Sequence, residues 1–350
     1  MRIALLTNAF PPDARGGAGA IAEVQARLLR EHGHDVRVFL GDLSWTRGTI
    51  AARLIRHIRD LQPNIALVRD IVAWKPDRLL THNLTGCGWG TPAAVRVTGV
   101  PWVHVLHDVQ GFEPSGQVAD SVPFTSWQRA WTFLRTRSMR MPDVVVSPTQ
   151  WLADAYTRRG WFSHTRVQVL PNPAPEQSSH GGGSPHVPIR LLYVGRLTAD
   201  KGIHVVRGVA ASMGAECCFT IIGGDGPDTG NTRYMGTCTT PEILDEMRNQ
   251  DALLVPSCIV ENQPTVMLEA MSRGLPIVAR AIGGIPETLG HAGELCATED
   301  VNEWVRAIRA CVHDWSAYAE ASRAAWDAHD PLRYGDDLVA CVSSADRSNL

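Results

Sequence analysis

Short apolar runs alternate with amphipathic stretches along most of the chain. In the first half the runs predict strands over residues 3–7, 35–39, 78–81, 102–106, 144–147 and 167–170. The stretches between them, with apolar spacings of three and four, predict helices over 20–31, 126–140 and 150–159. Strands that are apolar throughout and joined by helices are typical of parallel sheets covered by helices on both faces.

The alternation stops near the middle of the chain. Between Pro171 and Pro185 the sequence has no periodicity and consists mainly of Pro, Gly and Ser, which predicts a linker over 175–188 between domains at 1–174 and 189–330. It then resumes, with strands predicted over 191–194, 217–222, 252–255 and 277–279, and helices over 201–213, 264–273 and within 301–342. We therefore predict an α/β fold of two doubly wound, Rossmann-like domains, with a ligand in the cleft that they face.

Length, charge and cysteine usage narrow the function. A chain of 350 residues suits two domains, and 33 basic against 36 acidic residues give a net charge of −3, which argues against nucleic acid as a partner. No apolar run approaches about 18 residues and the first one ends at Pro11-Pro12, so we expect neither a membrane span nor a signal peptide. Eight scattered cysteines without a CxxC pair indicate reduced thiols, a cytoplasmic protein, and neither zinc nor redox chemistry.

Two places in the first half combine a strand end with candidate chemistry. Gly16 and Gly17 follow the first strand, where backbone amides can approach an anion, but the run is not a GxGxxG fingerprint and a flexible turn is the alternative. His107 follows the predicted strand 102–106, at the edge where open α/β sheets bind ligands, and a structural histidine is the alternative. His104 points to the opposite face of that strand, so these two histidines should not share a metal.

The first turn of the second domain carries two cations. Arg196 and Lys201 bracket the turn after the predicted strand 191–194, and Lys201 is one of only two lysines in a chain with 31 arginines. A cation near a helix start opposes the helix dipole, which makes sense if an anion lies between the two side chains. A planar guanidinium and a compact ammonium together suit two phosphoryl groups. An exposed pair of surface cations is the alternative.

The segment after 252–255 gives the strongest signal. A helix that begins with Pro264 in its first turn would present free amides to an anion, together with the loop residues Asn262, Gln263 and Thr265. Glu261 precedes this helix, and Glu269 lies among apolar helix residues, where ribose hydroxyls, or alternatively solvent at the helix edge, would satisfy its carboxylate. Two glutamates flanking an anion site describe a sugar, a diphosphate and a ribose, which together make a nucleotide sugar.

These motifs resemble a known family. The second-half motifs look like those of the retaining GT-B glycosyltransferases of family 4, also called group 1: Gly195-Arg196 with Lys201-Gly202, Pro256-Ser257, Glu261 to Glu269, and Gly283-Gly284-Ile285-Pro286-Glu287. Three first-half motifs are also similar to that family: Phe10-Pro11-Pro12 with Gly16-Gly17, His107-Asp108, and Leu170-Pro171-Asn172-Pro173.

The resemblance implies roles for the matching positions. Arg196 and Lys201 would bind the donor diphosphate and stabilise the charge of the leaving group. Glu261 would contact hydroxyls of the transferred sugar, helped by amides near Asn262 to Thr265, and Glu269 would hold the ribose. In the first domain, Gly16 and Gly17 would border the diphosphate and the acceptor, and His107 would lie beside the transferred sugar. The helical segment 331–350 would cross back onto the first domain.

The resemblance also implies the reaction. A sugar would pass, with retention and without a metal or other cofactor, from a UDP- or GDP-linked donor to a small-molecule, glycan or lipid-linked acceptor, in bacterial envelope glycan or natural-product glycoside synthesis. A nucleotide-sugar epimerase and a non-catalytic pseudo-glycosyltransferase stay open as alternatives. A glycan phosphorylase would need a pyridoxal-phosphate lysine, with only Lys75 and Lys201 available. The missing fingerprint argues against a dehydrogenase.

One stretch of the first domain suggests a partner. Between residues 126 and 140 aromatic side chains alternate with arginines: Trp127, Trp131 and Phe133 with Arg129, Arg135, Arg137 and Arg140. This pattern suits peripheral contact with a membrane surface or a phosphorylated acceptor. An amphipathic helix with a solvated polar face is the commoner explanation of such a pattern.

Overall fold

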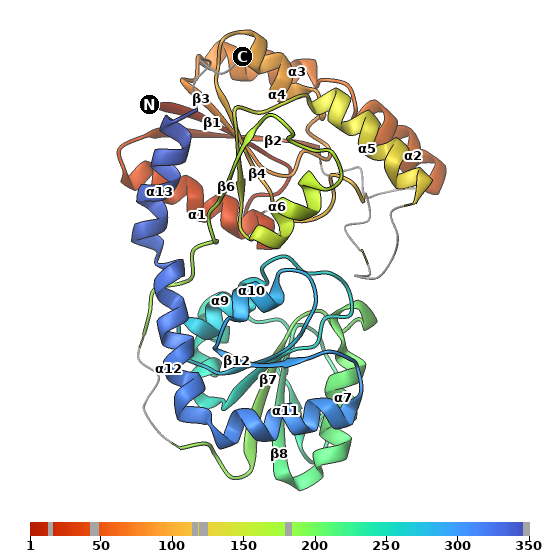
Figure 1. The fold of residues 1–350 in the computed structure, drawn as a ribbon, viewed down its shortest axis with the longest axis vertical. Coiled ribbons are helices and arrows are strands. Elements are labelled where there is room, and N and C mark those ends of the chain that lie inside the picture. The colour runs from red at the N-terminus through yellow and green to blue at the C-terminus, as the bar shows by residue number, and fades with distance from the viewer. Residues whose placement is uncertain (13–16, 43–48, 114–117, 119–124, 179–183, 346–350) are drawn as a thin grey trace. The chain divides into compact units, whose positions relative to one another are not determined.

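The chain folds into two compact units, each a parallel sheet flanked by helices (Figure 1). The computed structural model describes residues 1–12, 17–42, 49–113, 118, 125–178 and 184–345. Unit 1 comprises the described parts of Met1–Gln117, Val122–Asn172 and Pro331–Leu350, and unit 2 comprises those of Pro173–Asp330 together with Val118. The predicted α/β fold with two doubly wound domains is confirmed.

The sheet of unit 1 has six strands in the order β2-β1-β3-β4-β5-β6. Their bounds are β1 Arg2–Thr7, β2 Asp35–Leu40, β3 Arg78–Thr81, β4 Trp102–Val105, β5 Val144–Ser147 and β6 Arg166–Val169. Every pair is parallel, so all carboxyl ends lie at one edge of the sheet. The central strands β4 and β5 are buried along their whole length, which explains their unbroken apolar runs.

Seven helices are described in unit 1. They are α1 Gly17–Glu31, α2 Ile50–Arg59, α3 Ile65–Trp74, α4 Thr91–Val97, α5 Ser126–Met139, α6 Gln150–Thr157 and α13 Pro331–Ser343. Local sequence fixes their starts: Thr125 and Gln128 form a reciprocal capping box on α5, and the side chain of Asn64 caps α3. The last helix, α13, buries Tyr334, Leu338 and neighbouring residues in the same core as α1 and β1, so the end of the chain belongs to unit 1.

The sheet of unit 2 has the order β12-β11-β10-β7-β8-β9 and is also parallel throughout. Its strands are β7 Ile189–Val194, β8 Cys217–Ile222, β9 Thr232–Tyr234, β10 Ala252–Val255, β11 Ile277–Arg280 and β12 Gly293–Cys296. The helices that bear on the site are α7 Ile203–Met213, after a 3-10 turn at Ala199–Lys201, α9 Thr265–Met271 and α10 Ile285–Leu289. The others are α8 Thr240–Glu246, α11 Val301–His313 and α12 Trp315–Trp326.

Some predicted boundaries differ from the structure. The helix predicted from Pro264 begins one residue later, because Pro264 has extended backbone (φ −60°, ψ 122°) and is the residue before the first turn. Unit 2 begins at Pro173, ahead of the predicted linker, since the backbone at 174–178 hydrogen-bonds to unit 2, as in Ser178 N–H to Ser272 O (3.0 Å). The short strands β9 and β12 lie at sheet edges and lack an apolar run, so the sequence pattern missed them.

Candidate functional site

The carboxyl edge of the unit 2 sheet gathers the predicted donor-site residues. The neighbouring parallel strands β7 and β10 end at the same edge, and their following loops carry Arg196 and Lys201 on one side and Glu261 on the other. The loop after β11 lies next to that of β10, because Gly284 N–H donates to Glu261 O (2.8 Å). Residues far apart in the sequence are thus brought together by strand order alone.

Two glycines let these loops approach one another closely. Gly202 has a positive φ of 73°, and a side-chain Cβ there would overlap the carbonyl of Pro256. Gly283 has a φ of 62°, and a Cβ there would overlap the carbonyl of Glu261. Only glycine combines this backbone conformation with so little space. The contacts fix the loop that carries Glu261 between the turns after β7 and β11.

Lys201 and Glu261 form an ion pair in the centre of this edge. The Lys201 ammonium contacts Glu261 Oε1, and the hydroxyl of Ser257 donates to the same oxygen at 3.0 Å. The two charged side chains are 27% and 18% exposed, so the pair is sheltered but still reaches solvent. The structure thus brings the two residues into contact, and each charge neutralises the other.

Arg196 makes a second ion pair beside the first. Its guanidinium lies 2.8 Å from the carboxylate of Asp200, and the Arg196 side chain is 64% exposed. The turn between the two cations is held from below by Tyr193, whose hydroxyl donates to the carbonyls of Arg196 (2.7 Å) and Lys201 (3.3 Å). Both cations thus stand on a turn whose backbone is fixed by a buried side chain from β7.

The loop leading into α9 contains the remaining predicted binding residues. Asn262 is buried and Pro264 precedes the helix. The side-chain amide of Gln263 donates from Nε2 to Thr288 Oγ1 at 3.5 Å. The first amide of α9 with a backbone acceptor is that of Met267, which donates to Pro264 O (3.0 Å). Thr265 begins the helix, so its N–H precedes that first hydrogen bond.

Glu269 has an unusual environment for a carboxylate. It lies on α9 between the buried residues Leu268 and Ala270, and its carboxylate receives no hydrogen bond from a residue in the described ranges. Burial raises the pKa of Glu269 to about 7, and the charge of Arg273 opposes that rise only in part. The group would gain from hydroxyl donors that it lacks here.

The residues predicted in the first domain have different environments. Gly16 lies outside the described residues, and Gly17 is exposed at the start of α1. His107 follows β4 at the carboxyl edge of the unit 1 sheet and lies beside His82, which follows β3. The centroids of the two imidazoles are 5.0 Å apart with 25° between the ring planes, and His82 Nδ1 lies 2.7 Å from His107 Nε2, so the rings are joined edge to edge.

These histidines are neutral. Burial lowers the pKa of His107 to about 4 and that of His82 well below its ordinary value. His104 is separate, since its Nδ1 lies 2.8 Å from Thr81 Oγ1 and its pKa falls to about 3 through burial. His104 and His107 thus have different hydrogen-bond partners.

The buried environment of His82 also indicates where the shared proton lies. His82 is fully buried, and its Nε2 has no hydrogen-bond partner among the described residues. A buried N–H without an acceptor costs more than an acceptor without a donor, so we place the proton of His82 on Nδ1. His82 then donates to Nε2 of His107, whose own proton lies on Nδ1.

The sequence prediction did not include three residues that contact the predicted site residues. Asp200 pairs with Arg196, Ser257 donates to Glu261, and His82 orients His107. Each had a usable signal: Asp200 follows Arg196 by four residues, Ser257 precedes Glu261 by four, and His82 directly follows a strand that neighbours that of His107. Their roles depend on which strands are neighbours, and the pattern of one strand does not contain that information.

One group of potential metal ligands occurs in the part of the chain that the structure describes. The ligand atoms of His204, Cys258 and Glu299 lie within 4.8 Å of one another. The three already satisfy one another, with His204 Nε2 3.0 Å from Glu299 and the Cys258 thiol hydrogen-bonded to the same carboxylate. Burial and then the charge of Glu299 raise the pKa of the Cys258 thiol to about 11. None of them belongs to the predicted set.

Comparison with known families accounts for both units. Residues 188–314 match the model of the "Glycosyl transferases group 1" family, and residues 16–173 match that of the "Glycosyl transferase 4-like domain". The chain is a group 1 glycosyltransferase. Arg196, Lys201, Glu261 and Glu269 lie within the first match, and Gly16, Gly17 and His107 within the second. The resemblance seen in the sequence motifs is therefore confirmed.

Individual relatives agree with this assignment. The glycosyltransferase is 24% identical to a glycogen synthase of Mycobacterium tuberculosis, over 93% of this chain and 89% of the relative. It is also 24% identical to a GDP-mannose-dependent alpha-mannosyltransferase of the same organism, over 92% and 91%. The solved structure of Anabaena HepE in complex with UDP has the same fold, with a TM-score of 0.71 at 19% identity, over 98% of this chain and all of that one. The GT-B fold is thus established.

Proposed function

We propose that this glycosyltransferase moves a sugar from a nucleoside diphosphate sugar to an acceptor hydroxyl, with retention of anomeric configuration and without a metal. The observation that carries the proposal is the joint placement of Arg196, Lys201 and Glu261 at one sheet edge, inside the part of the chain that matches the group 1 family. Cations beside a polyol-binding carboxylate suit a diphosphate joined to a sugar.

Donor binding would work by exchange of partners. In the structure Lys201 neutralises Glu261, and Arg196 neutralises Asp200. A diphosphate offers the two cations a stronger, doubly charged partner, because charge-assisted hydrogen bonds to phosphate are short and strong. Once Lys201 turns to the phosphate, Glu261 is free to accept hydroxyls of the sugar while Ser257 holds one of its oxygens. The ion pair thus keeps both groups in position before the donor arrives.

The same cations would supply the chemistry of the leaving group. As the bond to the sugar breaks, negative charge grows on the diphosphate, and the ammonium and guanidinium groups stabilise it. A divalent metal plays that part in other transferases. The chain has no Asp-x-Asp sequence to hold one, and the cations of the turn after β7 replace it in this proposal.

The two remaining residues would act on hydroxyl groups. Glu269 would accept hydrogen bonds from the ribose, which would satisfy a carboxylate that has no donor in the ligand-free protein. His107 would donate from Nδ1 to a hydroxyl of the transferred sugar, with His82 holding its tautomer. A neutral histidine suits this role, because it orients a hydroxyl without attracting the diphosphate.

The donor base is proposed from the names of relatives. HepE was solved with UDP, and the mannosyltransferase relative is named for GDP-mannose, so a UDP- or GDP-sugar is the donor class to test first. No cofactor is required. We propose a glycan, small-molecule or lipid-linked hydroxyl as acceptor, in envelope glycan or glycoside synthesis.

The test is a panel of donors. UDP-, GDP-, ADP- and TDP-sugars are added to the full chain and thermal unfolding is followed, since a ligand that binds the native state raises Tm by mass action. The stabilising donor is then incubated with and without candidate acceptors, in buffer containing EDTA. We expect transfer with an α-linked product and no loss in EDTA. An inverted product, or activity that returns only with Mg²⁺, would overturn the mechanism, and conversion of the donor alone would reveal an epimerase.

A further inference from the structure

Two helices of unit 1, α2 and α5, lie side by side and share an inner face (Figure 1). The rings of His57 on α2 and Trp131 on α5 meet edge-on, with centroids 6.0 Å apart. The hydroxyl of Ser138 near the end of α5 donates to the carbonyl of Leu61, just after α2. The pair therefore forms one continuous layer on unit 1.

The inner face of α5 is firmly seated. Arg135 is 1% exposed and its guanidinium stacks on Trp89 (4.4 Å) and Trp131 (4.7 Å), while it also donates to Gly111 O at 3.3 Å. Trp131, Thr132 and Met139 are buried beside it. These contacts fix the orientation of α5. Its opposite side therefore faces away from the core.

That outer side carries several large apolar side chains, against the usual rule for a surface helix. Six of the fourteen large hydrophobic side chains that are exposed in the described ranges lie on α2, on α5 or directly after α5. They are Ile55, Ile58, Trp127, Phe133, Leu134 and Met141, with exposures of 52%, 54%, 55%, 64%, 44% and 39%. Ile55 and Ile58 are three residues apart and so share one face of α2. A gathering of this size marks an interaction surface.

The two helical segments that form this surface carry charges of one sign. The segments 50–59 and 126–141 contain seven arginines and no Asp or Glu. Arg59, Arg129, Arg137 and Arg140 are exposed, and none of them forms an ion pair with an acidic side chain of the described residues. Exposed arginines elsewhere are of both kinds: Arg27 and Arg309 pair with Glu31 and Glu216, whereas Arg207 and Arg306 form no ion pair with a described residue. We call Ile55, Ile58 and Arg59 of α2, together with the exposed residues of 127–141, the arginine-apolar face.

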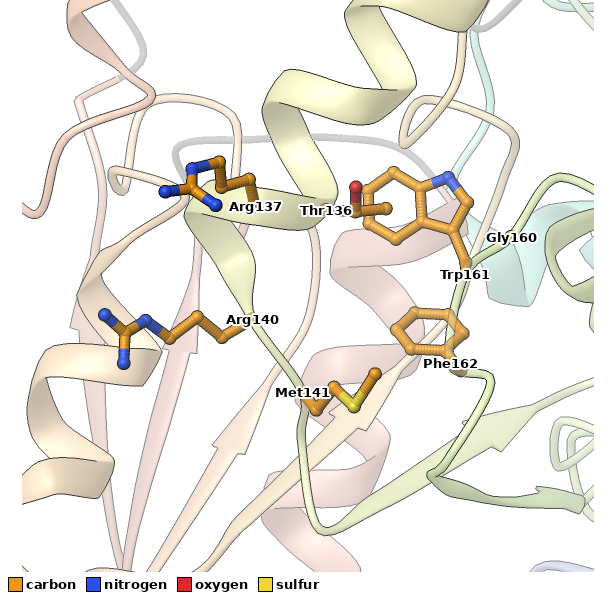
Figure 2. A pocket seen from close by; sticks show the side chains of 7 residues that line it. All are labelled: Thr136, Arg137, Arg140, Met141, Gly160, Trp161 and Phe162. Carbon is orange, nitrogen blue, oxygen red and sulfur yellow. The ribbon is translucent and has the colours of Figure 1, made fainter.

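The end of this face is hollowed (Figure 2). A pocket of about 360 Å³ is lined by Thr136, Arg137, Arg140, Met141, Gly160, Trp161 and Phe162. In Figure 2 the guanidinium groups of Arg137 and Arg140 extend to the same side of the helix end, while the rings of Trp161 and Phe162 lie on the other. The pocket thus brings two exposed guanidinium groups close to buried aromatic rings at the end of the helix.

We propose that the arginine-apolar face docks the protein on a lipid bilayer that contains anionic lipids. Exposed Trp, Phe, Leu and Ile side chains would enter the boundary between headgroups and acyl chains, and the arginines would contact the lipid phosphates. A nucleic acid would use the arginines but would leave the aliphatic side chains in water. None of the described helices has the length and apolar character needed to cross a bilayer, so the contact is peripheral.

The test measures vesicle binding by the full chain. Flotation with vesicles of equal parts phosphatidylcholine and phosphatidylglycerol is compared with vesicles of phosphatidylcholine alone. We expect the protein to float with the mixed vesicles, to stay behind with the neutral ones, and to be released by high salt. Absence of flotation with the mixed vesicles would overturn the proposal.

Two pairs of variants separate charge from apolar contact. Arg137→Ala with Arg140→Ala should weaken binding to the mixed vesicles about 30-fold, on the basis of a roughly fivefold contribution from each arginine. Phe133→Ser with Leu134→Ser should weaken binding at all salt concentrations. Matched controls on other surfaces are Arg27→Ala with Arg309→Ala, and Val97→Ser with Leu332→Ser, whose exposures are 74% and 71%. Equal binding by test and control variants would contradict the assignment.

Two further measurements keep the result specific. Thermal stabilisation by the donor nucleotide should be unchanged in all these variants, so that failure of docking and failure of the proposed function are distinguished. The molar mass in solution should also be the same in wild type and variants. A wild-type dimer that becomes a monomer in Phe133→Ser with Leu134→Ser, without vesicle binding in either, would show that the face binds a second copy and would overturn the lipid proposal.

Discussion

Each unit has polar side chains at the carboxyl edge of its own sheet, but those of unit 2 are charged and those of unit 1 are neutral. In unit 2 the edge carries full charges, and Lys201 and Arg196 reach solvent while paired with Glu261 and Asp200. In unit 1 the edge carries His82 and His107, which burial keeps neutral. Paired charges near solvent can change partners at little cost, whereas a buried neutral hydrogen bond is fixed by its surroundings. The first arrangement suits an anion that comes and goes, and the second suits orientation of a hydroxyl.

Removal of Lys201 should produce the largest effect. Lys201→Ala deletes the compact cation that we propose to stabilise the leaving group, and we expect kcat/KM for transfer to fall by about 100- to 1000-fold. Stability should change little, by about 1 kcal/mol, because the pair with Glu261 is partly open to solvent. Steady-state kinetics and thermal unfolding measure the two quantities.

The chain offers a matched control for this variant. Lys75, the only other lysine, ends α3 in unit 1, and Lys75→Ala should leave transfer unchanged. Full transfer by Lys201→Ala, or an equal loss in both variants, would remove the basis for a charged edge in unit 2.

The neutral state of the histidines in unit 1 predicts a pH dependence of stability. Their folded pKa values lie below the unfolded value of about 6.5, so the unfolded chain binds more protons at acidic pH. Their contribution is complete above pH 6.5 and is lost as the pH falls toward about 4. We expect a loss of about 3 kcal/mol in that window from His107 alone, and His82 adds to it.

Denaturant unfolding at several pH values tests this expectation. The double variant His82→Asn with His107→Gln keeps hydrogen-bonding side chains but cannot titrate, so its unfolding free energy should vary less between pH 6.5 and 4 than that of the wild type. His313→Gln, at the exposed end of α11, is the matched control. If the unfolding free energy of the double variant varied with pH as much as that of the wild type, the pKa values of these histidines would not be lowered in the folded protein. The difference in charge between the two sheet edges would then disappear.

Arg196 should matter less than Lys201. Its side chain is 64% exposed, so its attraction for the diphosphate is screened by solvent, and Arg196→Ala should raise the donor KM about tenfold with a smaller change in kcat. Arg233→Ala, which removes another exposed arginine paired with an acid, should not change KM. An effect of Arg196→Ala on kcat alone would show that this cation contributes nothing to donor binding and acts only in the transition state.

The sequence predicted the fold and the positions of the site residues better than the contacts between those residues. Unbroken apolar strands and the restart after Pro185 were sufficient for two doubly wound units, and the cations after β7 and the glutamates around α9 followed from their positions at strand ends. The partnership of Lys201 with Glu261 was beyond a pattern, because it requires β7 and β10 to be neighbours. The same limit hid His82.

The outer face of α5 shows a different limit. Its mixture of aromatic residues and arginines was visible in the sequence, but a solvated polar face was the commoner interpretation. Only burial of Arg135 and Trp131 reveals that the apolar side chains Phe133 and Leu134 are the exposed ones. A periodic pattern indicates that two faces exist, and packing decides which of them is covered.

The smallest expected effect concerns Glu269, which is intermediate between the charged and the neutral state. Burial raises its pKa to about 7, so the carboxylate is protonated in much of the protein below that pH and ionised above it. Ribose hydroxyls donate more strongly to the ionised form, so nucleotide affinity should increase as the pH rises through 7. Calorimetric titration of the stabilising nucleotide sugar at pH 6 and pH 8 should give Kd values that differ about fivefold, with tighter binding at pH 8.

Glu269→Gln cannot ionise and should bind equally at both pH values, with the weaker affinity. Glu320→Gln, on the exposed side of α12, should keep the wild-type difference. If Glu269→Gln retained the pH dependence, the titrating group would lie elsewhere, and the ribose would have to be held by a residue that is already charged at pH 6.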